Sequence, residues 1–88
     1  MYWTIYALIS VHRNWIYVGI SDNIKRRFHE HASGWEKTTA PYRPFYLLEL
    51  AGSFTRQDAR QIEKWYKTGY GKETIKKLLD EGYPFREE

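Results

Sequence analysis

Two side chains on one short predicted helix could act on a phosphate ester. Arg27 and His31 stand four residues apart, so a helix over 24–32 places them in one column beside its apolar stripe. Arginine carries a permanent charge on a planar fork that fits phosphate, and histidine can hydrogen-bond a phosphate or relay a proton. Alone, each has an ordinary explanation: Arg27 as a solvated cation, and His31 as a residue favoured by the dipole at the helix C-terminus.

Two tyrosines and a glutamate extend this set. Tyr6 and Tyr17 lie in segments rich in aromatic and β-branched residues, and Glu63 lies in a later helical segment. A glutamate can supply a carboxylate to Mg²⁺ or Mn²⁺, whereas a tyrosine, with an ordinary pKa near ~10, accepts a proton at neutral pH only beside a cation. The ordinary explanations are a core role for each tyrosine and a pairing of Glu63 with Lys67 at i+4.

The elements that must position these residues form an α+β domain. The sequence predicts strands over 2–9, 15–20 and 45–51, and helices over 24–32, 55–67 and 73–79, in the order ββαβαα. A glycine-containing stretch at 69–71 separates the last two helices, and residues 35–44 form a polar, basic loop expected near the substrate. We expect a small, largely antiparallel three-stranded sheet flanked by three helices.

The hairpin between the first two strands decides whether the two tyrosines meet. Side chains alternate between the faces of a strand, so Tyr6 and Tyr17 share a face only if paired residue numbers sum to an odd value. That condition requires an even number of residues in the connecting loop. Gly19 shares the face of Tyr17 on the second strand.

The helix that carries Glu63 has a local start signal and an apolar stripe. Thr55 and Asp58 resemble a capping box, and Ala59, Ile62 and Tyr66 form the stripe. Glu63, at i+4 from Ala59, is therefore expected at the edge of the buried face.

Length, charge and composition limit the function classes. The chain fits one domain, which we place at 1–80, followed by an acidic tail at 81–88. The net charge is +3, but residues 80–88 contribute −3, so the preceding part carries +6 and suits a polyanionic partner. Cysteine is absent, and the three histidines lack the spacing of a zinc site. With no basic signal-peptide start and no apolar run of about 20 residues, we expect no membrane and a cytoplasmic location.

The order of these segments resembles the GIY-YIG endonuclease superfamily. Thr4-Ile5-Tyr6 and Tyr17-Val18-Gly19 are similar to the two halves of its signature on a hairpin. Residues 22–31 are similar to its helix with the catalytic arginine, and residues 54–63 to its helix with the metal-binding glutamate. The resemblance spans about residues 2–79 and is closest to short, stand-alone bacterial members related to the excision-repair nuclease module.

The resemblance implies a compact active site. Its members would be Tyr6, Tyr17, Arg27, His31 and Glu63, with Gly19 as part of the signature. Glu63 would hold one Mg²⁺ or Mn²⁺ ion, weakly without DNA because it is the single protein ligand. Arg27 would stabilise charge on the phosphoryl group, and the tyrosines would act as general base and its partner, in an order that stays open. His31 would hydrogen-bond a tyrosine or the phosphate.

The implied function is that of a metal-dependent endonuclease that hydrolyses phosphodiester bonds in DNA, in repair or recombination. No element suited to reading bases is evident, so we expect branched, damaged or non-specific DNA as the substrate. We expect the following cations among the phosphate contacts: Lys25, Arg26, Lys37, Arg43, Lys67 and Lys76. Thr4 replaces the glycine of the signature, and the last helix lacks an asparagine. These departures leave one alternative, a catalytically attenuated nucleic-acid-binding module of the same fold that acts with a protein partner.

Overall fold

A small antiparallel sheet carries helices on both faces. The computed structural model describes residues 2–82 and 86–87. The elements, in chain order, are β1 (Trp3–Ser10), β2 (Ile16–Ser21), α1 (Ile24–Ala32), the short 3-10 helix η1 (Ala40–Tyr42), β3 (Phe45–Ser53), α2 (Arg56–Tyr66), α3 (Gly69–Asp80) and β4 (Arg86–Glu87). The strand order is β2-β1-β3-β4, and every neighbouring pair is antiparallel. The predicted α+β fold is confirmed, and β4 adds a two-residue strand at one edge.

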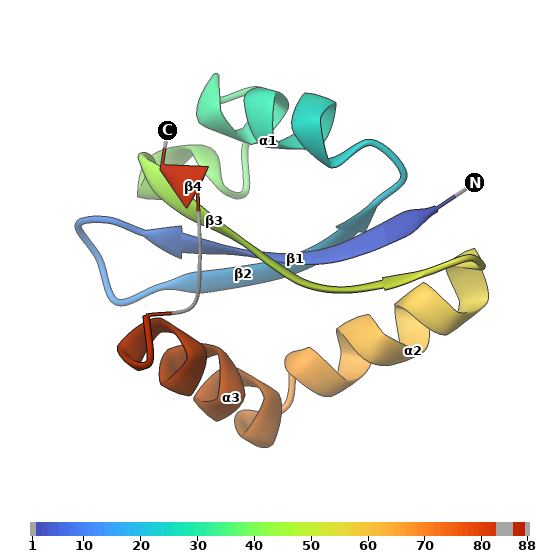
Figure 1. Ribbon diagram of the computed structural model, residues 1–88. Helices are drawn as coiled ribbons and strands as arrows, with labels where there is room; N and C mark the ends of the chain where they lie inside the picture. Colours follow the sequence, from blue (N-terminus) through green and yellow to red (C-terminus); the bar gives the residue numbers. More distant parts are fainter. Residues whose placement is uncertain (1, 83–85, 88) are drawn as a thin grey trace.

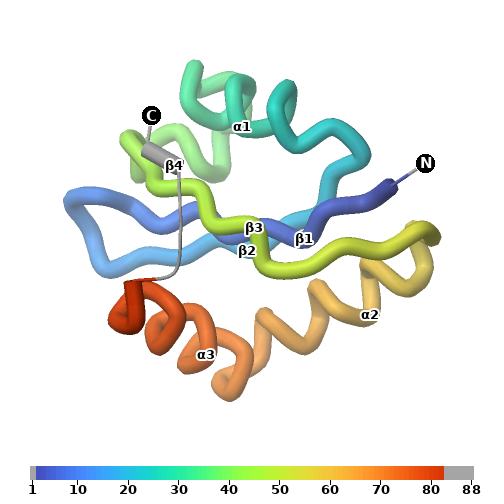
Figure 2. Tube along the Cα trace, in the orientation of Figure 1, coloured from blue at the N-terminus to red at the C-terminus, as the bar shows by residue number. Residues whose placement is uncertain are grey.

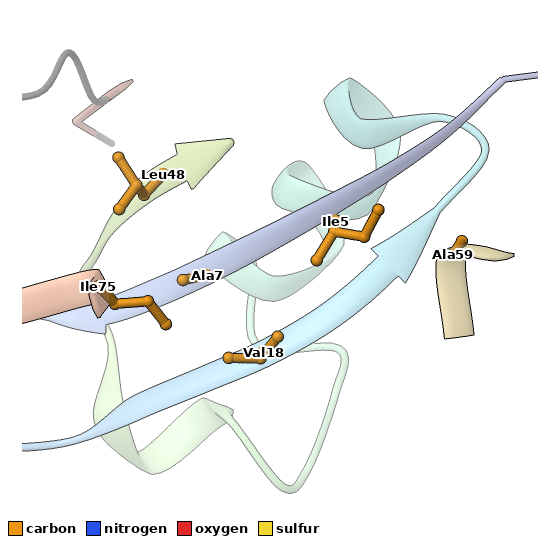
Figure 3. Packing of buried hydrophobic residues seen from close by; sticks show 6 residues of the cluster. All are labelled: Ile5, Ala7, Val18, Leu48, Ala59 and Ile75. Carbon is orange, nitrogen blue, oxygen red and sulfur yellow. The ribbon is translucent and has the colours of Figure 1, made fainter. Parts of the chain in front are cut away.

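The sheet separates two hydrophobic cores. Helix α1 lies over one face, and α2 and α3 lie side by side over the other (Figures 1 and 2). The face toward α2 and α3 carries what we call the helix-pair core: Ile5, Ala7, Val18, Leu48, Ala59 and Ile75 (Figure 3). The face toward α1 carries the α1-side core: Tyr6, Leu8, Phe45 and Leu47. Because β1 alternates between the faces, the same strand contributes to both cores.

The register of the hairpin brings the two tyrosines to one face. Tyr6 pairs with Gly19, and Leu8 pairs with Tyr17, so the paired numbers sum to an odd value. The last pair, Ile9 with Ile16, encloses an even number of residues, which meets the condition for a shared face. Tyr6 and Tyr17 therefore both face α1. The pairing of β1 with β3 shifts register between Ile5 and Tyr6, so a β-bulge lies beside the first tyrosine.

Side-chain caps begin the helices, and one of them corrects the sequence prediction. The Thr55 side chain accepts the amide of Asp58, as the capping signal predicted. The last helix was predicted over 73–79, but it begins earlier, at Gly69, because the Thr68 hydroxyl caps the amide of Gly71. The glycines at 69–71 predicted a break between the last two helices. In the structure, however, Gly71 is buried and lies inside the first turn of α3.

The C-terminal segment is only partly described. Of the tail predicted over 81–88, residues 83–85 and 88 lie outside the described residues. Within it, Arg86 pairs with Leu47 and Glu87 with Tyr46 along β3. Among the helices that the structure describes, none has the length and apolar character needed to cross a bilayer.

Candidate active site

Gly19 allows the two tyrosines to approach each other. Tyr6 is 1% exposed, Tyr17 is partly exposed, and their ring centroids lie 6.4 Å apart. A β-carbon on Gly19 would lie 2.8 Å from Tyr6 Oη and 3.0 Å from Tyr17 Cε2, closer than carbon atoms pack. The glycine of the predicted signature therefore leaves the space that the hydroxyl end of Tyr6 fills.

His31 joins the first tyrosine to the segment that follows α1. Its imidazole is fully buried, with Nε2 at 3.0 Å from Tyr6 Oη and Nδ1 at 2.9 Å from Thr39 Oγ1. Thr39 is also fully buried, and its hydroxyl donates to the carbonyl of Glu36 over 3.3 Å. Burial, and secondly the nearby charge of Arg27, lower the pKa of His31 to about 4, so the imidazole is neutral at physiological pH.

Arg27 lies between two carboxylates. Its Nη1 is 3.1 Å from Glu30 Oε1, and its Nη2 is 3.0 Å from Glu36 Oε2. Burial alone would lower the pKa of the guanidinium, but hydrogen bonds to Glu36, Glu30 and Tyr6 outweigh it and raise the pKa above its usual range. Arg27 is thus a permanent cation whose guanidinium group is already paired with the carboxylates of Glu30 and Glu36 when no DNA is bound.

Tyr6 is a neutral phenol in this arrangement. Burial, followed by the proximity of Tyr17, raises its pKa well above the ordinary value. The hydrogen bond from Arg27 and its positive charge act in the opposite direction, as expected for a cation beside a tyrosine, but they are the smaller effects. In the absence of a ligand, Tyr6 therefore keeps its proton.

Glu63 lies in the layer across the sheet from Arg27 and His31. It belongs to α2, and its charge is the smallest of the effects that raise the pKa of Tyr6. The side chain is nearly buried, with 7% exposed, as its place beside the apolar stripe predicted. Its Oε1 is 3.1 Å from Arg60 Nη1 and its Oε2 is 3.3 Å from Lys67 Nζ. The ordinary pairing with Lys67 is therefore present in the structure.

Glu63 is a single carboxylate that could contribute to a metal site. Within residues 2–82 and 86–87, no group of three or more histidine and carboxylate side chains gathers to hold a metal. A divalent ion would have Glu63 as its protein ligand and would have to replace Arg60 and Lys67 at the carboxylate. Water and a phosphate oxygen would complete its oxygen shell.

The predicted phosphate-contacting cations are exposed but lie on two sides of the molecule. Lys25 and Arg26 belong to α1, and Lys37 and Arg43 lie between α1 and β3. Lys67 caps the C-terminus of α2 and Lys76 lies on α3, in the layer across the sheet (Figure 1). The structure thus places the first four on α1 or in the segment that follows it, and Lys67 beside Glu63.

Three residues of the site were missed in the sequence. Glu30 had a usable signal, because it stands three residues after Arg27 on the same helix. Glu36 and Thr39 had none, since both lie in the segment predicted as an irregular loop. Their contacts exist only because that segment folds back over α1.

Comparison with known proteins gives one family match. Residues 2–77 match the sequence model of the GIY-YIG catalytic domain. Neither a curated protein nor a solved structure matches the chain.

Proposed function

Since the chain belongs to the GIY-YIG catalytic domain family, which is a family of endonucleases, we propose that it cleaves DNA with the help of Mg²⁺ or Mn²⁺. GIY-YIG domains act on DNA and are generally dependent on a divalent metal. The finer proposal is structure-selective or weakly sequence-specific cleavage in DNA repair or recombination. Within the described residues no element suited to reading bases is evident, and the exposed cations around α1 are suited to phosphates, so both features support weak sequence specificity.

One observation carries the proposal: Tyr6 is hydrogen-bonded to His31 on the α1 face, and the charge of Arg27, one helical turn before His31, acts on the Tyr6 hydroxyl. Arg27 is suited to bind the phosphate, because its planar fork can exchange a carboxylate for a phosphate oxygen. The Tyr6 hydroxyl is already hydrogen-bonded to His31. We therefore assign proton acceptance from the attacking water to Tyr17, which is the more exposed of the two tyrosines.

Glu63 is the proposed metal ligand. A divalent ion there would supply an activated water and positive charge at the phosphate. Arg60 and Lys67 orient the carboxylate in the absence of the ion, since each contacts one of its oxygens. They would also keep the buried charge of Glu63 compensated when no metal is present.

The test is nicking of supercoiled plasmid and branched DNA by the purified protein with Mg²⁺ or Mn²⁺. Arg27→Lys keeps the charge but loses the fork, and Glu63→Gln removes the metal ligand, so both variants should lose activity. Glu73→Gln is the matched control, because it removes an exposed carboxylate on α3. Activity that survives in both site variants would refute the proposal, and DNA binding without cleavage by the wild type would assign the chain to the binding-module alternative.

A further inference from the structure

We propose that Thr39 is a positioning residue of the active site, which selects the tautomer of His31 and thereby aims the hydroxyl of Tyr6. The significance for catalysis rests on the proposed function. The tautomer itself does not, because it follows from the hydrogen-bond geometry of the DNA-free protein.

A chain of hydrogen bonds runs from the Glu36 carbonyl through Thr39 and His31 to Tyr6, and the Glu36 carbonyl sets the direction of donation. The carbonyl of Glu36 can only accept, so the Thr39 hydroxyl proton points toward it over 3.3 Å. The Thr39 oxygen must then accept from its other neighbour, Nδ1 of His31, at 2.9 Å. Nδ1 therefore carries a proton.

The remaining nitrogen of the ring then defines the role of Tyr6. A neutral imidazole has one N–H, so with Nδ1 protonated, Nε2 is an acceptor. The low pKa of His31, about 4, keeps the ring neutral at physiological pH. Since Nε2 lies 3.0 Å from Tyr6 Oη, the tyrosine hydroxyl donates to the histidine.

Burial keeps this order in place. His31 and Thr39 are fully buried and Tyr6 is 1% exposed, so bulk water has little access to compete for these groups. Within the described part of the chain, every buried side-chain nitrogen and oxygen atom has a hydrogen-bond partner. A change at Thr39 would leave the inner end of the chain without its partner.

The order matters because it makes Tyr6 an acceptor for Arg27. With its proton directed at His31, the phenol oxygen is free to present lone pairs to the positive charge of Arg27, which acts on Tyr6. In the opposite tautomer, His31 would donate to Tyr6, whose own proton would then turn toward Arg27, another donor. Glu36 connects the two ends, since it accepts from Thr39 through its carbonyl and from Arg27 through its carboxylate.

The experiment is ¹⁵N NMR of the imidazole nitrogens in the DNA-free protein. Wild type and Thr39→Ser should show the proton of His31 on Nδ1, and the isosteric Thr39→Val should show it on Nε2. A proton on Nε2 in the wild type, or on Nδ1 in the valine variant, overturns the inference. If the valine variant fails to fold, the wild-type and serine spectra decide, since a proton on Nε2 in either overturns it.

Kinetics supply the second measurement. Thr39→Ser should keep the wild-type nicking rate, while Thr39→Val should lose at least about tenfold in kcat, with KM for DNA unchanged because Thr39 is buried away from DNA. Equal rates in the two variants would overturn the positioning role. If the wild type shows the expected spectrum but no nicking, the proposed function fails and the tautomer assignment stands.

Discussion

Adding one methyl group at Gly19 should separate catalysis from stability. In Gly19→Ala, the new β-carbon would lie 2.8 Å from Oη and 2.9 Å from Cζ of Tyr6, and 3.0 Å from Cε2 of Tyr17. Carbon atoms pack at about 3.5–4.0 Å, so one ring must move by up to about 1 Å. Tyr6 cannot move freely, since it is 1% exposed and hydrogen-bonded to His31.

The two effects differ in size. Overpacking costs about 1–3 kcal/mol, and replacing a glycine within a strand returns about 0.5–1 kcal/mol. We therefore expect the free energy of unfolding to fall by at most about 2.5 kcal/mol, which a domain stabilised by about 5–15 kcal/mol survives. A shift of about 1 Å would break the 3.0 Å contact of Tyr6 with His31, and a misplacement of that size reduces catalysis by about 100-fold.

The assay pairs urea unfolding with plasmid nicking on the same protein samples. Gly69→Ala is the matched control, because a β-carbon there would meet no atom within 4 Å. It should nick like the wild type and be at least as stable in urea. If Gly19→Ala nicks DNA as fast as Gly69→Ala does, the close approach at Gly19 is irrelevant to the chemistry and the reasoning fails.

Three further predictions follow from the same geometry. Burial and Arg27 hold the pKa of His31 at about 4 against an ordinary 6.5, so the unfolded state takes up the proton first as pH falls. The free energy of unfolding, measured by urea titration, should then drop by about 3 kcal/mol from pH 6.5 to pH 4. His31→Gln should reduce this dependence on pH, whereas the exposed control His29→Gln should keep it. Glu36→Gln removes a competitor for phosphate at Arg27, so DNA affinity measured by fluorescence anisotropy should rise about two- to fivefold, but not in an Arg27→Gln background. In Gly71→Ala, a β-carbon would lie 2.3 Å from backbone atoms at the end of α2, so thermal unfolding should show a loss of at least about 3 kcal/mol.

Each of these has its own contradicting result. Equal pH slopes in the wild type and His31→Gln would mean that His31 titrates alike in the folded and unfolded chain. A gain in affinity that persists without Arg27 would mean that Glu36 acts through general charge repulsion. Wild-type stability in Gly71→Ala would mean that α2 and α3 can separate at little cost.

The parts that could be predicted from sequence depend on short-range rules. Side chains alternate along the strands, so Tyr6 and Tyr17 share one face if the hairpin loop has an even number of residues. The loop length fixes the register, and the register fixes the face of each side chain. The spacing of Arg27 and His31, and the Thr55 cap, are decided within single turns of helix. The position of Glu63 at the edge of its stripe follows from the same helical period.

The parts that could not be predicted depend on the path of a segment that has neither a helical nor a strand pattern of hydrophobic residues. Thr39 meets His31 because residues 36–42 fold back onto α1, and no repeating pattern marks that path. The start of α3 was misplaced for a different reason. A glycine weakens a helix by local propensity, but Gly71 is required by the close approach of α2, which only the tertiary structure reveals.

The two cores on opposite faces of the sheet divide the chain into parts that tolerate change differently. Substitutions within the helix-pair core alter stability without touching Tyr6, His31 or Arg27, which lie across the sheet. That core is therefore the natural target for a repacking library screened on thermal stability alone. Glu63 is the exception, since it lies on α2 between the core residue Ala59 and Tyr66, which packs against that core. Such a library has to preserve the register of α2, because any rotation of that helix would carry the proposed metal ligand with it.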